Sequence, residues 1–222
     1  MFNKDCITLE ACVESLDEAK NAAELGADRI ELCSRLDLDG LTPAKKTIIS
    51  ILENIRIPIK VMIRPRQGNF VYDEDDVKQM ESAIMFCKNN GVSHIVLGVL
   101  NNSNEIDIAT MTRLSEISKP MHITFHKAID QTNDIVKQVE VLCSLNIVKS
   151  ILTAGGRGDL IKNKETAKTL LDRFSSELDI VLAGSITKNN LKMIHNEFQA
   201  NEYHGRKIVG DLSQNNSFIY KV

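Results

Sequence analysis

The chain has 222 residues, of which 43% are hydrophobic and 26% are charged, and its formal net charge is −3. The slightly acidic balance excludes a broad basic surface for nucleic acid or for an anionic membrane. The N-terminal stretch lacks the apolar core of a signal peptide, and apolar runs such as IVLGVL (95–100) are too short to span a bilayer. We therefore expect a cytoplasmic protein with no nucleic-acid or membrane partner.

Runs that favour a buried strand alternate with amphipathic runs that favour a helix. The predicted strands are CITLEAC (6–12), DRIELC (28–33), IKVMIRP (59–65), SHIVLGV (93–99), MHITFH (121–126), VKSILT (148–153), DIVLAG (179–184) and NEYHG (201–205). The predicted helices between them are 15–26, 43–54, 74–91, 106–118, 133–146, 164–174 and 187–198. Capping patterns support these limits: four residues are expected N-caps, two glycines are expected helix ends, and one proline is expected in a first turn, namely Ser15, Asp73, Asp107, Thr187, Gly26, Gly91 and Pro43.

Strands that alternate with helices predict right-handed βαβ units and a parallel sheet. Eight such units in 222 residues suit a (β/α)8 barrel, the TIM-barrel class, better than a doubly wound sheet. We expect a single domain over residues 1–222. Its last unit is predicted to be short or atypical, because RKIVGDLSQNNSFIYKV, after residue 205, is too short for a loop and a full-length helix. Either the last helix is stunted or a partner chain covers that side, and we expect a homodimer or higher homo-oligomer.

Polar side chains end several of the predicted strands, at the edge where TIM barrels carry their active sites. The first two strands both end on Glu-x-Cys, with Glu10 and Cys12 in one and Glu31 and Cys33 in the other. Side chains two residues apart share a face of a strand, so all four are predicted to point into the barrel if the apolar residues between them face the helices. The same alternation turns Arg64, Thr124 and His126 inward, and the last predicted strand carries His204 at its end.

These charged residues have two interpretations. Glu10 and Arg64 can form a buried ion-pair network that only stiffens the barrel. Alternatively the charges serve a ligand or a reaction, which is favoured as more strands contribute because burying several charges is costly.

Two glycine-containing loops are candidates for binding an anion. AGSIT (183–187) is a Gly-Ser turn before a helix, after the seventh strand, where TIM barrels commonly hold a phosphate. The glycines of TAGGRGD (153–159) allow close approach of a ligand to the backbone. For both loops a tight turn without a ligand remains an alternative. With two arginines of the third strand, the candidate anion-binding residues are Arg64, Arg66, Thr153, Gly155, Gly156, Gly184 and Ser185.

The five cysteines are odd in number and thinly spread, and they form no disulfide framework and no CxxC zinc motif. Taken singly, each is most simply a small buried apolar residue. The cysteines are Cys6, Cys12, Cys33, Cys87 and Cys143.

Several strings along the chain together resemble the CutC family. They are LEAC (9–12), GADRIELC (26–33), GLTP (40–43), IRPRQGNFVY (63–72), TFHKAID (124–130), ILTAGG (151–156) and AGSIT (183–187). The resemblance runs from about residue 6 to about residue 205. It implies a TIM barrel, a role in cytoplasmic copper homeostasis and Cu(I) bound by the cysteines that end the first two strands, here Cys12 and Cys33. Soft thiolates do select Cu(I). No organic cofactor is expected.

Three functions remain open at this point. The first is a copper-binding protein that uses Cys12 and Cys33. The second is an enzyme for a small anionic metabolite, including phosphorylated ones, in which arginines bind the anion, a glutamate is the general base and a histidine the acid. Its catalytic candidates are Glu10, Glu31, His126 and His204. The third is a barrel that serves only as a binding scaffold.

Overall fold

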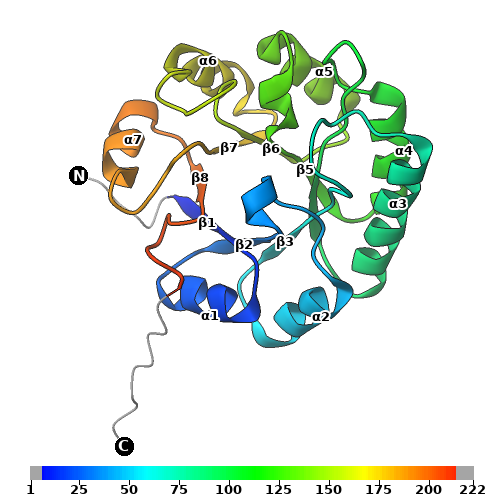
Figure 1. Ribbon diagram of the computed structural model, residues 1–222. Helices are drawn as coiled ribbons and strands as arrows, with labels where there is room; N and C mark the ends of the chain where they lie inside the picture. Colours follow the sequence, from blue (N-terminus) through cyan, green and yellow to red (C-terminus); the bar gives the residue numbers. More distant parts are fainter. Residues whose placement is uncertain (1–6, 214–222) are drawn as a thin grey trace, which may run out of the picture.

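In the computed structural model, which describes residues 7–213, eight parallel strands close into a barrel in sequential order (Figure 1). Strand β1 pairs with β8, and this pairing closes the ring. The predicted (β/α)8 TIM barrel is therefore confirmed. The strands are β1 (Thr8–Val13), β2 (Arg29–Leu32), β3 (Ile59–Met62), β4 (His94–Leu97), β5 (His122–Phe125), β6 (Ser150–Thr153), β7 (Asp179–Leu182) and β8 (Glu202–Gly205).

Seven α-helices surround the barrel among the described residues, each between two successive strands (Figure 1). They are α1 (Leu16–Glu24), α2 (Lys45–Asn54), α3 (Glu74–Asn89), α4 (Ile108–Ser118), α5 (Ile135–Leu145), α6 (Lys164–Phe174) and α7 (Leu191–Phe198). Two short 3-10 helices lie in the connections after β2 and β5, η2 (Leu36–Leu38) and η3 (Lys127–Gln131). None of the described helices is long and apolar enough to cross a membrane.

Most of the predicted helix limits are confirmed. The side chains of Ser15, Asp73 and Asp107 accept hydrogen bonds from backbone N–H groups in the first turns of α1, α3 and α4. The predictions for Pro43 and Thr187 are wrong, since α2 begins at Lys45 and α7 at Leu191. Before α7 the chain first makes a separate turn, in which the Lys188 N–H donates to the carbonyl of Lys207, so the helix starts later than the polar pattern suggests.

The alternation of side chains along each strand separates the interior of the barrel from its outer layer. Leu9, Ala11, Ile30 and Leu32 belong to the large apolar cluster between strands and helices. The glutamates and cysteines of the first two strands are buried on the opposite face, inside the barrel, as predicted. The barrel interior is thus polar at β1 and β2, while its outer surface is sealed by apolar contacts.

No helix follows β8 within residues 7–213, so the prediction of an atypical last unit is confirmed. The chain instead passes beside α1 (Figure 1) and buries Ile208, Val209 and Leu212 in the main apolar cluster. The Asn21 amide of α1 donates to the Leu212 carbonyl at 2.8 Å. Its own chain therefore covers the side that an eighth helix would cover.

Gly205 at the end of β8 allows this path, because a Cβ at this position would overlap the carbonyl oxygen of Ile186. We expect Gly205→Ala to reduce the free energy of unfolding by about 1–3 kcal/mol, since the overlapping atom is backbone and cannot rotate away. Urea unfolding measures the loss. Gly91→Ala is the control, because a Cβ there has no atom within 4 Å and meets only an unfavourable φ of +79°. Similar losses in both variants would contradict the close approach.

Candidate functional site

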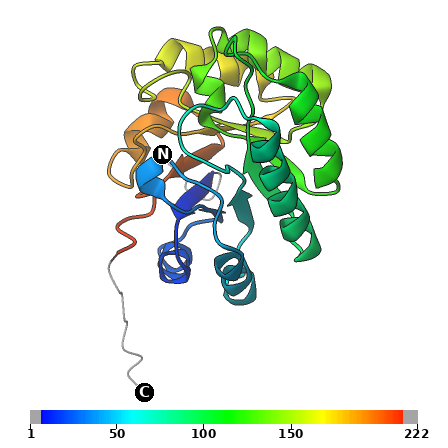
Figure 2. The same cartoon turned by 45° about the vertical axis from the view of Figure 1, so that its right-hand side comes forward.

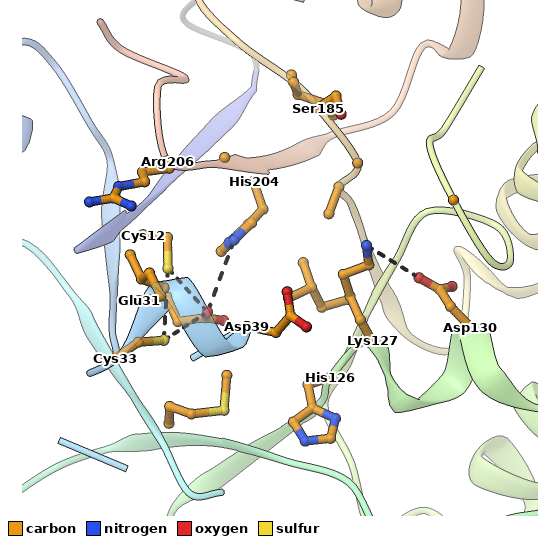
Figure 3. Close-up of a pocket in the computed structure, with 18 of the residues that line it drawn as sticks. Cys12, Glu31, Cys33, Asp39, His126, Lys127, Asp130, Ser185, His204 and Arg206 are labelled. Atoms are coloured by element: carbon orange, nitrogen blue, oxygen red, sulfur yellow. Dashed lines mark hydrogen bonds and ion pairs between the residues drawn. The ribbon is translucent and has the colours of Figure 1, made fainter. Parts of the chain in front are cut away.

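A cavity of about 540 Å³ opens at the C-terminal end of the barrel (Figure 3). Cys12, Glu31, Cys33 and His204 line one part of it. The segments that follow β2 and β3 and the connections after β5, β6, β7 and β8 line the rest. In Figure 2 the same barrel is seen turned, with its helices still forming the outer layer. The cavity thus lies where TIM barrels bind ligands.

The two thiols lie side by side around one carboxylate (Figure 3). The Sγ atoms of Cys12 and Cys33 are 3.7 Å apart. Oxygen Oε1 of Glu31 lies 3.7 Å from the first and 3.4 Å from the second. Strand register explains this cluster, because β1 and β2 pair Cys12 with Glu31 rather than Glu10 with Glu31. These three side chains form a group that can hold a metal ion.

The thiols are almost fully buried, with 5% of Cys12 and 1% of Cys33 exposed. Met62, Val96 and Leu36 pack against them. Leu36 belongs to η2, which lies over the centre of the barrel in Figure 1. The short helix therefore covers the thiol pair from the solvent side.

Arg64 holds the segment that covers the thiols. Its Nη1 donates to the carbonyl oxygens of Leu38, Asp39 and Gly40, at 3.0, 3.3 and 3.2 Å. Its Nη2 donates to the Gly68 carbonyl. Although Arg64 lines the cavity as the sequence suggested, these donors are already used by the backbone.

Below the thiols, Glu10 forms ion pairs with three cationic side chains. Its carboxylate lies 2.5 Å from Nε of Arg29, 3.0 Å from Nζ of Lys60 and 2.8 Å from Nδ1 of His204. Arg29 also pairs with Glu202. The sequence suggested a buried ion-pair network between Glu10 and Arg64. The network exists, but the cations that pair with Glu10 are Arg29, Lys60 and His204. Lys60 and Arg29 share the inward face of β3 and β2 by the alternation rule, and this signal in the sequence was missed.

These contacts shift the protonation of the buried groups. Burial alone would raise the pKa of Glu10, but Lys60, His204 and Arg29 outweigh it and hold that pKa well below its usual value. Burial likewise opposes a charge on His204, yet Glu31, Cys12 and Glu10 raise its pKa well above the usual value. His204 is therefore an imidazolium between two glutamates, with Nε2 4.0 Å from Glu31. Burial raises the pKa of Glu31 itself.

We expect Glu10→Gln to reduce the free energy of unfolding by about 3–5 kcal/mol, because the change leaves Lys60 and His204 buried without their anion. Urea unfolding at neutral pH measures this loss. The matched control is Asp37→Asn, which removes a carboxylate from an exposed pair with Arg35. An exposed pair contributes little, so a loss in Asp37→Asn as large as that in Glu10→Gln would contradict the assignment.

His126 is a buried neutral donor at the wall of the cavity, with 4% of the residue exposed. Its Nδ1 accepts a hydrogen bond from the Ala128 N–H, so the ring proton lies on Nε2, which has no hydrogen-bond partner among the described residues. Burial and the nearby Arg64 lower the pKa of His126 to about 3. The Cα of Gly98 packs against the ring so closely that a Cβ there would lie 2.6 Å from Nδ1.

This shift makes stability depend on pH. Folded His126 stays neutral to about pH 3, while the unfolded chain takes up this proton near pH 6.5. The unfolded state binds more protons between these values, so the free energy of unfolding falls as pH is lowered, by up to about 1.4 kcal/mol per pH unit. In His126→Asn, whose amide oxygen can still accept from Ala128, we expect a shallower loss between pH 7 and pH 4 in urea unfolding. His122→Asn, at an exposed histidine, is the control, and equal slopes in wild type and His126→Asn would contradict the prediction.

Arg66 was predicted to belong to the anion site, but its side chain lies elsewhere. Arg66 does not line the cavity; it pairs with Asp76 at 2.6 Å and donates to the Val71 carbonyl. Its position outside the barrel mouth follows from the bend after β3, which the sequence pattern does not show.

The glycine loop after β6 is occupied by a carboxylate of the chain itself. Asp130 accepts hydrogen bonds from Oγ1 of Thr153 and from the N–H groups of Ala154 and Gly156. The Gly155 N–H donates to Thr153. Thr153 and Gly155 therefore stabilise the loop and do not line the cavity, whereas Gly156 does.

Gly184 and Ser185, after β7, do line the cavity, and Figure 3 shows Ser185 at its edge. So do four cationic side chains that sequence reasoning missed, Lys127, Arg157, Arg206 and Lys207. Each of them stands in a connection rather than in a strand, so strand alternation gave no signal for them. Their nearness to the strand ends was the one usable clue.

The fold and the cavity define a TIM-barrel protein with a candidate metal site of two thiols and a carboxylate at its C-terminal mouth. The model of the CutC family matches residues 7–209. The chain is 34% identical over 196 residues to the human "Copper homeostasis protein cutC homolog", covering 88% of this chain and 71% of that protein. It is 36% identical over 200 residues to the CutC family protein of Aliivibrio fischeri (strain MJ11), covering 89% and 81%.

The crystal structure of the CutC protein from Streptococcus agalactiae superposes with a TM-score of 0.84 at 30% sequence identity, covering 91% of this chain and 99% of that one. The chain belongs to the CutC family.

Proposed function

We propose that this chain binds Cu(I) through Cys12 and Cys33 and takes part in copper homeostasis. The observation that carries the proposal is the pair of reduced thiols, 3.7 Å apart, at the end of a cavity. Relatives that are named copper homeostasis proteins support it.

The donor set fits a soft ion. Thiolates and thioethers select Cu(I) over harder cations, and Met62 packs in the same buried cluster as the two cysteines. The two sulfur atoms, 3.7 Å apart, are close enough to bind one ion together. For a third donor, the thioether of Met62 is the soft side chain in the same cluster, and Glu31 is the harder one.

The protonation of the thiols determines how affinity changes with pH. The hydrogen bond with Cys33 outweighs burial and lowers the pKa of Cys12, which favours the thiolate form that a metal ion binds. The hydrogen bond with Cys12, together with burial, raises the pKa of Cys33 well above its usual value. A metal that binds both cysteines must displace the proton of Cys33, so its affinity rises with pH.

A cytoplasmic location is part of the same proposal. Two thiols at 3.7 Å that remain unpaired suit a reducing compartment, where such pairs persist as ligands instead of forming a disulfide. Assembly into a homodimer or higher homo-oligomer stays a prediction. It does not depend on an open side of the barrel beside α1, because residues 208–212 of the same chain cover that side.

We expect Cys12→Ser/Cys33→Ser to weaken Cu(I) binding at least 100-fold, because hydroxyl groups are poor ligands for a soft ion. Competition with a chromophoric Cu(I) chelator in the absence of oxygen measures the affinity. The matched control is Cys143→Ser, a half-buried cysteine on α5 that does not line the cavity.

Met62→Leu nearly conserves volume and removes the thioether, so it is expected to cause a smaller loss of Cu(I) affinity, about tenfold. Equal Cu(I) affinity in wild type and the double serine variant would overturn the proposal.

A further inference from the structure

The rim of the cavity carries more cationic than anionic side chains, although the carboxylates of Asp39 and Asp130 also line it (Figure 3). Lys127, Arg157, Arg206 and Lys207 line it from the connections after β5, β6 and β8. Figure 3 shows Lys127 and Arg206 on opposite sides of the opening, with Ser185 between them at the upper edge. None of these side chains contributes to the thiol and carboxylate cluster.

These cations are compensated by the chain to different extents. Nζ of Lys127 lies 3.9 Å from Asp130, a carboxylate already engaged by the loop after β6. Arg206 lies 3.3 Å from Glu14 and 3.7 Å from Glu18, so two carboxylates already compensate its charge, although its own side chain is half exposed. Lys207 makes no ion pair with any residue in the described part of the chain. Arg157 likewise makes no ion pair with the residues described, so the rim keeps uncompensated positive charge at Arg157 and Lys207, which favours an anion.

The connection after β7 adds backbone donors. Within residues 7–213, the N–H groups of Gly184 and Ser185 are without a hydrogen-bond partner. Ser185 has a left-handed backbone (φ +61°), and Asn190 fixes the turn by bonds to Ser185 and Thr187. The loop after β6 differs, since Asp130 fills it. In TIM barrels the loops after strands 7 and 8 commonly hold a phosphate.

Three side-chain polar atoms at the wall of the cavity have no hydrogen-bond partner among the described residues. They are Oε2 of Glu31, an acceptor, and two donors, Nε of Arg64 and Nε2 of His126, which carries the ring proton. The three residues are 2%, 4% and 4% exposed. Buried polar atoms of this kind are normally paired, and a hydroxyl or carbonyl group of a ligand can pair with them.

We propose that the cavity binds a small organic phosphate with hydroxyl or carbonyl groups. Its phosphate lies at Ser185, Arg206 and Lys207, and its neutral end faces Glu31 and His126. The volume of about 540 Å³ is in the range of small-molecule sites, roughly 300–1,000 Å³. The groups proposed to bind the phosphate do not belong to the thiol cluster, although the neutral end of the ligand shares Glu31 with it, and the proposal goes beyond the copper-binding function.

Titration with inorganic phosphate and with D-ribose 5-phosphate tests the proposal, using amide NMR to locate binding and calorimetry to measure affinity. Both probes are expected to shift the amides of Ser185 and Lys207. Arg206→Gln/Lys207→Gln is expected to lower the affinity for both probes at least tenfold. The control Arg113→Gln/Lys119→Gln removes the same charge from exposed pairs of α3 and α4 and should leave both affinities unchanged.

His126→Asn tests the deeper end of the cavity. It removes the Nε2 donor, so it is expected to lower the affinity for D-ribose 5-phosphate at least fivefold and to leave the affinity for inorganic phosphate unchanged. D-ribose without phosphate is expected to bind far more weakly than its 5-phosphate.

The proposal is overturned if millimolar concentrations of both probes leave the Ser185 and Lys207 amides unshifted, or if the rim and control variants weaken binding equally. Cys12→Ser/Cys33→Ser separates it from copper binding, because this variant is expected to keep its affinity for D-ribose 5-phosphate while losing Cu(I). Conversely, Arg206→Gln/Lys207→Gln is expected to keep Cu(I) binding.

Discussion

The ion pairs of one fully buried carboxylate, Glu10, hold the interior of this barrel together. Arg29, Lys60 and His204 reach it from β2, β3 and β8, so a single anion on β1 joins four strands at the point where the barrel closes. Each of these charges would be costly to bury alone, and together they compensate one another. Because His204 also approaches Glu31, the same interaction sets the charge beside the thiols.

This network divides the polar interior into parts with different roles. The charges around Glu10 are satisfied by one another and serve the fold. Above them, the thiols of Cys12 and Cys33 lie under η2, whose position depends on Arg64. At the opening, Arg157 and Lys207 make no ion pair with any residue that the structure describes, whereas Arg206 pairs with Glu14 and Glu18. The thiols and the cationic rim are thus separate groups within one cavity, and Glu31 lies beside the thiols.

The pattern of the sequence predicts the strands well, because apolar alternation and glycine punctuation are local signals. It also predicts that Glu10, Cys12, Glu31 and Cys33 point inward. It fails for contacts that depend on the paths of connections. Arg64 was expected to pair with Glu10 and instead binds the carbonyls over the thiols. The glycines after β6 suggested an open anion site, yet Asp130, from a different connection, fills it.

The sequence by itself determined the barrel class and the inward direction of the two Glu-x-Cys pairs, because both follow from a two-residue period repeated along the chain. Only the tertiary structure decided which groups meet. The stagger between neighbouring strands of a closed barrel places Cys12 opposite Glu31 and Glu10 opposite Arg29. Hydrogen bonds and ion pairs act over a few ångströms, so a shift of two residues in register determines whether a glutamate faces a thiol or a cation.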